Sequence, residues 1–117
     1  MSSTHYLFDG TITNGAFVYV GVPISPLGTI GVQISWLDTT TSAAIVLELT
    51  NYDADEAPVA SAGSAWKWKD SGVSITGPTG GSTGSSIVNI ENVRQRRARL
   101  KITATAASRI QVTEGMP

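Results

Sequence analysis

The side chains that most enzymes and metal sites depend on are scarce in this sequence. It contains one histidine, His5, and no cysteine. A catalytic Ser, His and acid triad needs a histidine as its general base, and we expect His5 to be an ordinary surface residue in a frayed terminal segment. Structural zinc sites are built from clusters of His and Cys. We therefore predict a non-enzymatic protein with no catalytic residues, no cofactor and no bound metal.

Two loops carry residue types that bind ions in other proteins. Asp53, Asp55 and Glu56 place three carboxylates close together, and calcium prefers oxygen ligands. The loop lacks the central glycine and the distant bidentate glutamate of an EF-hand, so we interpret it as a solvated acidic loop. The glycine-rich stretch 77–84 lacks the Lys-Ser/Thr ending of a phosphate-binding loop and leads into a strand. We interpret that stretch as a flexible connector.

Basic side chains gather near the C-terminal end of the chain. On the expected strand 98–105 and the residue before it, period-two alternation projects Arg97, Arg99 and Lys101 to one side. Such a stripe suits phosphates or an acidic protein partner, whereas the plainer interpretation is the solvated outer face of an edge strand. Because the net charge is −1 and no aromatic residue separates the arginines, we expect a protein partner rather than nucleic acid.

The three tryptophans separate into two groups. Trp36 is in register with Ile30, Val32 and Ile34 on one strand face, so we predict that it is a core residue. Trp66 and Trp68 alternate with lysines and are expected to share one face of a short strand. All three tryptophans together with Tyr52 suit a sugar-stacking platform, but large aromatic residues more often belong to a core or a subunit contact.

The residues predicted to make protein contacts are Trp66, Trp68, Arg97, Arg99 and Lys101.

These residues must be positioned by β-strands, because no window shows a convincing helical period. Period-two alternation and turn residues predict strands at 6–13, 16–22, 29–37, 43–52, 65–70, 86–91, 98–105 and 109–114. The Asn14-Gly15 dipeptide after the first strand favours a tight turn. About eight short strands are typical of an antiparallel sandwich or barrel. We expect an all-β, jelly-roll-like antiparallel sandwich, while strand pairing stays open because alternation does not select neighbours.

The chain length of 117 residues suits a single domain spanning 1–117. Within it we expect a flexible N-terminus at 1–5, a loop at 53–63, a flexible Gly/Ser loop at 77–85 and one helical turn at 92–95. No apolar run approaches the roughly 20 residues that span a bilayer, and no secretion signal is evident. Charged residues make up only 15% of the chain, so much of the surface is cheap to dehydrate, which favours protein contact.

Several strand motifs occur in a characteristic order along residues 31–112. They read GVQISW, IVLELTNY, WKWKD and, after a glycine- and serine-rich stretch, SIVNIENVRQRRARLKITATA. In this order the chain resembles the small β-sandwich proteins of tailed bacteriophage virions. In those proteins an SW-ending strand, a strand ending in Thr-Asn, a WxD-like strand and an Arg-containing penultimate strand recur.

The resemblance implies a virion structural protein of jelly-roll or discoidin-like form, made in the host cytoplasm. Its implied partners are the phage major capsid protein and further copies of itself, as a trimer or a similar ring. Because the sequence has no repeats and no fibrous segment, we expect a head decoration protein that binds the capsid exterior. A tail or baseplate component and a carbohydrate-binding β-sandwich remain the alternatives.

Overall fold

The structure is a computed structural model that describes residues 4–60 and 62–115. These residues form eight β-strands and one turn of 3-10 helix, η1. The strands are β1 (Tyr6–Ile12), β2 (Phe17–Val22), β3 (Ile30–Trp36), β4 (Ala43–Thr50), β5 (Lys69–Asp70), β6 (Gly84–Ile90), β7 (Arg97–Ala104) and β8 (Ser108–Glu114), and η1 spans Ala65–Lys67. No helix among the described residues is long and apolar enough to cross a membrane.

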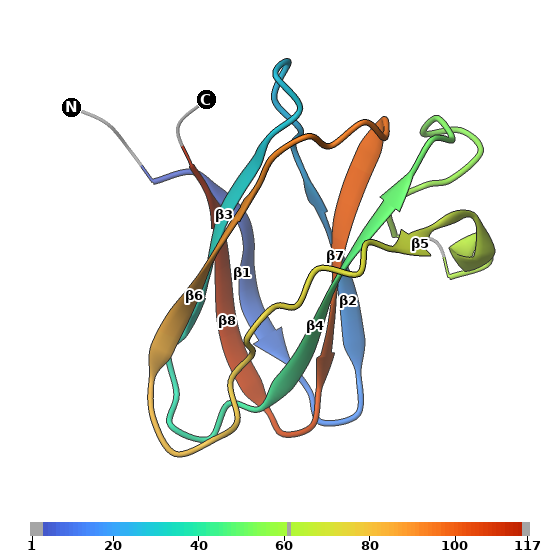
Figure 1. Cartoon of the computed structure of the whole chain (residues 1–117). Coiled ribbons are helices and arrows are strands. Elements are labelled where there is room, and N and C mark those ends of the chain that lie inside the picture. The colour runs from blue at the N-terminus through green and yellow to red at the C-terminus, as the bar shows by residue number, and fades with distance from the viewer. Residues whose placement is uncertain (1–3, 61, 116–117) are drawn as a thin grey trace.

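The strands form two four-stranded antiparallel sheets, ordered β1-β8-β3-β6 and β2-β7-β4-β5 (Figure 1). The first strand pairs with the last, the second with the seventh, the third with the sixth and the fourth with the fifth. This nested pairing is that of one long hairpin rolled into two layers, which is the topology of a jelly roll. The predicted all-β jelly-roll sandwich is therefore confirmed.

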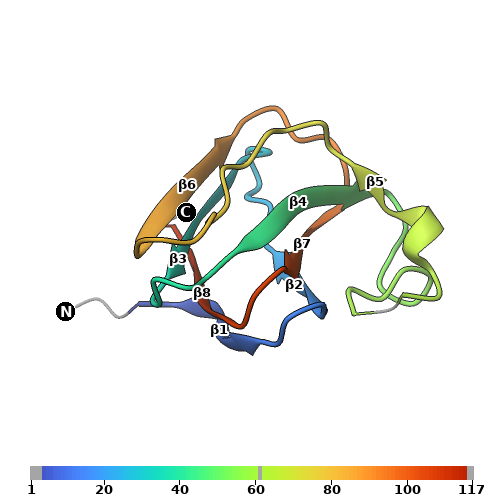
Figure 2. The same cartoon turned by 90° about the horizontal axis from the view of Figure 1, so that it is seen from below.

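The core lies between the inward faces of the two sheets, which Figure 2 shows as separate layers. Strand β3 buries every second residue from Ile30 to Trp36 and leaves Gln33 exposed between them. In β7, Leu100 and Ile102 are fully buried. Because side chains alternate across a strand, each of these strands presents an apolar row to the opposite sheet. The predictions that Trp36 is buried and that these faces point inward are confirmed.

The segment around Trp66 and Trp68 differs from its prediction as a continuous amphipathic strand. The amides of Lys67 and Trp68 donate to the carbonyls of Ser64 and Ala65, which closes the η1 turn. A 3-10 turn rotates the chain by roughly 120° per residue, so residues two apart point to different sides. Trp66 is 74% exposed and Trp68 is 5% exposed. The prediction that the two indoles share a face is wrong.

Two loops also differ from their predictions. No helical turn forms at 92–95, because the Val93 amide donates to the Gly28 carbonyl and Asn92 adopts a positive φ of 59°. The expected Gly/Ser loop ends early, since Gly84 and the residue after it belong to β6. Its backbone is anchored by hydrogen bonds from the Ala43 amide to Pro78 and from Gly81 to residue 39. The flexibility of this loop stays a prediction.

The two ends of the described chain lie side by side. The Glu114 amide donates to the His5 carbonyl, and the His5 side chain contacts the Glu114 carboxylate. Residues 1–3 of the segment predicted to be flexible lie outside the described residues.

Two turn glycines provide a matched test of the backbone geometry. Gly15 and Gly28 both have positive φ, at 84° and 77°. A Cβ on Gly28 would lie 2.8 Å from the Val93 carbonyl oxygen, whereas a Cβ on Gly15 would meet nothing within 4 Å. We expect Gly15→Ala to lower the free energy of unfolding by about 1 kcal/mol and Gly28→Ala by about 2–3 kcal/mol. Equal losses in urea unfolding would contradict this account.

Candidate binding surfaces

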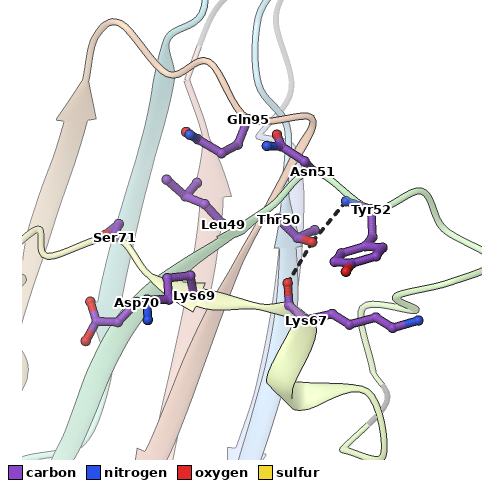
Figure 3. Close-up of a pocket in the computed structure, with 9 residues that line it drawn as sticks. All are labelled: Leu49, Thr50, Asn51, Tyr52, Lys67, Lys69, Asp70, Ser71 and Gln95. Carbon is purple, nitrogen blue, oxygen red and sulfur yellow. Dashed lines mark hydrogen bonds between the residues drawn. The ribbon is translucent and has the colours of Figure 1, made fainter.

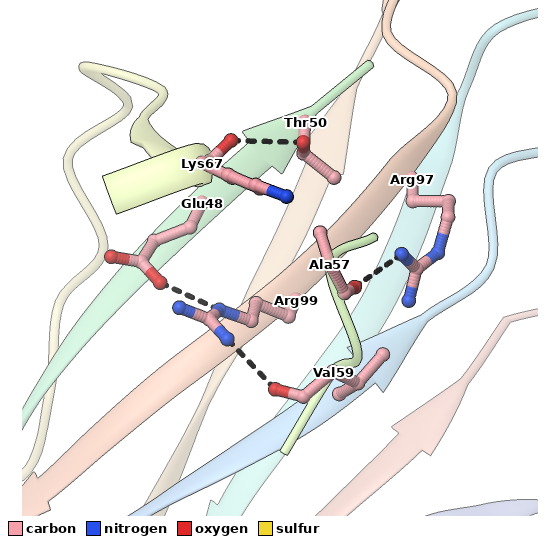
Figure 4. Close-up of polar contacts among 7 residues, drawn as sticks. All are labelled: Glu48, Thr50, Ala57, Val59, Lys67, Arg97 and Arg99. Atoms are coloured by element: carbon pink, nitrogen blue, oxygen red, sulfur yellow. Dashed lines mark hydrogen bonds and ion pairs between the residues drawn. The ribbon is translucent and has the colours of Figure 1, made fainter. Parts of the chain in front are cut away.

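The basic stripe of β7 lies on the outer face of the sheet β2-β7-β4-β5, as its alternation predicts. That face is not open, because part of the chain between β4 and β5 packs over it. We call the described residues of this connection, 51–60 and 62–68, the strap. Figure 4 shows its Ala57 and Val59 lying over Arg97 and Arg99. Gly21 of β2 lies beneath the strap, where a Cβ would make ordinary van der Waals contact with a Val59 methyl group at 3.4 Å.

Arg99 is fully buried beneath the strap. Its Nε donates to Glu48 Oε1 at 2.7 Å, and its Nη1 donates to the Val59 carbonyl at 2.8 Å. The guanidinium carbon lies 3.6 Å from the ring centroid of Tyr19 and 4.3 Å from that of Trp68. A cation between two aromatic rings and a carboxylate is strongly held. Arg99, expected on an outward face, is thus enclosed within the chain, and Trp68 is buried with it; their contact with a partner stays a prediction.

The other two members of the stripe also find partners within the chain. Arg97 Nη1 donates to the Ala57 carbonyl, and Lys101 Nζ lies 4.8 Å from the Phe17 ring centroid. The aromatic partners come from β2, where Phe17 and Tyr19 occupy outward positions, and Tyr19 pairs directly with Lys101. Aromatic residues thus accompany the basic residues across strands, not along β7. The alternation of β2 indicates that Phe17 and Tyr19 share one face of that strand. Only the pairing of β2 with β7 shows that this face lies beside the basic residues.

Trp66 is the most exposed of the five predicted contact residues. It packs edge-to-face on Tyr52, with the ring centroids 6.3 Å apart and an interplanar angle of 71°. Lys67 Nζ lies 4.9 Å from the Tyr52 centroid and 5.3 Å from the Trp66 centroid. The same ammonium donates to the Glu56 carbonyl at 3.0 Å. The strap therefore presents an aromatic pair that is supported from within the chain.

A pocket of about 500 Å³ adjoins this pair, between the end of β4 and strand β5. Figure 3 shows the residues that line it: Leu49, Thr50, Asn51, Tyr52, Lys67, Lys69, Asp70, Ser71 and Gln95. The buried hydroxyl of Thr50 donates to the Lys67 carbonyl at 2.9 Å and accepts from the Tyr52 amide at 3.1 Å. One side chain thus joins two segments of the pocket wall, which fixes their separation.

The outer face of the sheet β1-β8-β3-β6 has a different character. Figure 2 shows no strap over this face among the described residues. Its register aligns Gln33 with Thr113 and Ile87, and Ser35 with Gln111 and Ser85. Its charged side chains, Asp9 and Arg109, form an ion pair. Ile87 is 66% exposed. We call this the open face; its outward side chains are Tyr6, Asp9, Thr11, Gln33, Ser35, Ser85, Ile87, Asn89, Arg109, Gln111 and Thr113.

The acidic loop considered as a calcium site is organised by its own backbone. Asp53 Oδ1 accepts hydrogen bonds from the amides of Asp55 and Glu56, each at 3.1 Å. This is the pattern of an aspartate that stabilises a turn. Within residues 4–60 and 62–115, no group of three or more His, Asp or Glu side chains is placed to hold a metal ion.

Comparisons with known proteins leave the family of this chain undetermined. No protein-family model matches the sequence. No curated protein and no solved structure matches it either.

The buried ion pair between Arg99 and Glu48 is expected to hold the strap on the sheet. We expect Arg99→Met to lower the free energy of unfolding by about 2–4 kcal/mol, because the Glu48 carboxylate and the Val59 carbonyl both lose a charged donor. Hydrogen exchange should accelerate in residues 51–60 and 62–68 before the sheets open. Arg94→Met, at an exposed arginine, is the control and should change stability by less than about 0.5 kcal/mol. Unaltered exchange in the strap of the Arg99 variant would show that Arg99 does not anchor it.

The ion pair on the open face predicts a dependence of stability on pH. The hydrogen bond from Arg109 lowers the pKa of Asp9 below its ordinary value of 3.8, and Gln111 contributes in the same direction. Its stabilisation is thus present above the unfolded-state pKa and is lost as the pH falls through the lowered folded-state pKa. Asp9→Asn should reduce the thermal midpoint at neutral pH, with the difference vanishing in acid. Asp55→Asn is the control; a pH-independent difference for Asp9→Asn would refute the assignment.

Proposed function

We propose that this protein is a non-enzymatic structural component of a tailed bacteriophage virion. In this proposal it is a head decoration protein that binds the outer surface of the capsid as a cyclic homo-oligomer. The jelly-roll topology and the resemblance of the strand motifs support the proposal. The open face is the observation that carries it, because that face has the chemistry of a protein-docking surface.

The open face is inexpensive to dehydrate. Charged groups are the most costly to remove from water, and here Asp9 and Arg109 already neutralise each other. Its other polar side chains are hydroxyls and amides, which both donate and accept hydrogen bonds across an interface. Ile87 adds exposed apolar surface in the same row as Gln33. Depletion of unpaired charge is typical of the centres of protein interfaces.

The size of the open face favours binding by several copies together. Four strands of about seven residues cover roughly 19 by 23 Å in projection, or about 440 Å², from ordinary strand spacing and rise. A standard protein interface buries roughly 800 Å² on each partner. A single copy would therefore bind a capsid weakly. Joining copies into a ring raises the effective concentration of each face once the first has docked.

Docking through the open face leaves the strap pointing away from the capsid, because the two sheets have opposite outer faces (Figure 2). In this arrangement Arg97, Arg99 and Lys101 hold the strap and do not contact the capsid. Trp66 lies on the outward side of the assembly.

The proposal is tested by mixing purified protein with capsids and, separately, with tails from virions that lack it. We expect wild-type protein to sediment with capsids and to raise their melting temperature. Ile87→Asp should weaken capsid binding at least tenfold, or by about 1.4 kcal/mol, because it buries an unpaired charge.

Trp66→Ala, on the opposite side of the sandwich, is the matched control and should bind capsids as the wild type does. Circular dichroism and analytical ultracentrifugation establish that both variants keep their fold and their assembly mass. Binding to tails alone would place the protein in the tail instead of the head. Absence of sedimentation with either particle, or equal binding by Ile87→Asp, would refute docking through the open face.

A further inference from the structure

The strap exposes one tryptophan in a fold that buries the other two. Trp36 and Trp68 are 9% and 5% exposed, whereas Trp66 is 74% exposed. Large aromatic side chains left in water forgo the free energy of burial, roughly 25 cal/mol per Å² of apolar surface. Tyr52, on which Trp66 packs, is also partly exposed. The two rings together form an accessible aromatic surface at the end of the molecule that carries the β4–β5 connection.

This aromatic surface is held in place before any ligand arrives. The ammonium of Lys67 lies over both rings and is fixed by its hydrogen bond to the Glu56 carbonyl. The Thr50 hydroxyl holds the backbones of Tyr52 and Lys67 at a constant separation. Side chains that are ordered in advance lose little entropy on binding. The arrangement therefore suits recognition by stacking better than a mobile surface tryptophan would.

The adjoining pocket supplies polar groups of complementary kinds. Figure 3 shows the amides of Asn51 and Gln95 on one side of the pocket and Asp70 and Ser71 across from them. Amides and hydroxyls both donate and accept, and a carboxylate accepts. Asp70 Oδ1 accepts from the Gly72 amide at 2.8 Å, which orients the carboxylate. The volume of about 500 Å³ lies within the usual range of roughly 300–1,000 Å³ for small-molecule sites.

These features select among classes of ligand. A purely apolar ligand would leave the amides and the carboxylate without partners, at about 1–3 kcal/mol for each buried group. A phosphate would meet the ammonium groups of Lys67 and Lys69 as well as the Asp70 carboxylate, so phosphate is the competitor that the experiment below must include. A pyranose ring combines an apolar C–H face with a rim of hydroxyls that each donate and accept. That combination matches an aromatic ring beside amide, hydroxyl and carboxylate groups.

We propose that this pocket, together with Tyr52 and Trp66, is a carbohydrate-binding site. One pyranose residue occupies the pocket against Tyr52, and the next residue of the glycan chain stacks on Trp66. The site lies away from the open face, so a virion-bound copy would carry it outward. The inference does not depend on capsid docking, since every residue that it uses belongs to the end of β4, the strap, β5 or the adjacent loops.

The test begins with an array of neutral and uronate-containing glycans, probed with the full-length protein. The oligosaccharide with the strongest signal is then titrated while tryptophan fluorescence is recorded. Because Trp66 is the exposed tryptophan, stacking should shift its emission and protect it from acrylamide quenching. We expect Trp66→Ala and Asn51→Ala each to weaken binding about tenfold or more, with the fold retained by circular dichroism.

Two control variants separate this site from the rest of the surface. Leu27→Ala removes another exposed apolar side chain, 88% exposed in the β2–β3 loop, and should bind the glycan as the wild type does. Ile87→Asp should also retain glycan binding, even where it abolishes capsid binding. The inference is overturned if no glycan on the array binds the protein and no glycan changes its tryptophan fluorescence. It is equally overturned by binding that neither Trp66→Ala nor Asn51→Ala weakens, or by binding that inorganic phosphate displaces.

Discussion

Every surface of this protein depends on the register of the nested antiparallel strand pairs. A strand presents alternate residues to opposite faces, so a slip of one residue would exchange its core and its outer side chains. In β7 such a slip would move Leu100 and Ile102 out of the core and drive Arg99 into it. The apolar rows of the two sheets therefore hold the register, and the register decides which polar groups meet on the outer faces.

The Arg99 cluster illustrates this dependence. Pairing of β4 with β7 places Glu48 directly opposite Arg99, and pairing of β2 with β7 places Tyr19 beside them. The strap completes the cluster by supplying the Val59 carbonyl and the ring of Trp68. A buried arginine needs partners for its charge and its donors. The hydrogen bonds of Nε and Nη1 hold the strap on the sheet, whereas the buried Nη2 has no hydrogen-bond partner among the described residues.

The two outer faces consequently differ in what they offer to a partner. One is closed by the strap, and its basic residues are occupied with backbone carbonyls and aromatic rings. The other is nearly free of unpaired charge and rich in hydroxyl and amide groups. A β-sandwich can dock one such face on a larger particle while its loops point away from that particle. It can then attach to the particle and bind a separate ligand at the same time. The capsid and carbohydrate proposals assign these two tasks to opposite sides of one rigid core.

The amino-acid sequence by itself determined the strand pattern, the inward rows and the burial of Trp36, because period-two alternation is a local property of each strand. It also grouped Tyr52 with the three tryptophans as aromatic residues that suit sugar stacking, while favouring a core or subunit contact for the tryptophans. Alternation describes the two faces of a strand but not whether a distant loop covers the outer one. Only the tertiary structure therefore decided that Arg99 is buried and that Trp66 and Trp68 diverge.

The pocket likewise could not be predicted from sequence patterns. Its amides, Asn51 and Gln95, come from loops that are far apart in the chain and meet because β4 and β7 are neighbours in one sheet. Polar loop residues carry no periodic signal before those strands are paired. Tertiary packing supplied the pairing, since the free energy that selects strand neighbours comes from burial between the sheets and not from any single segment.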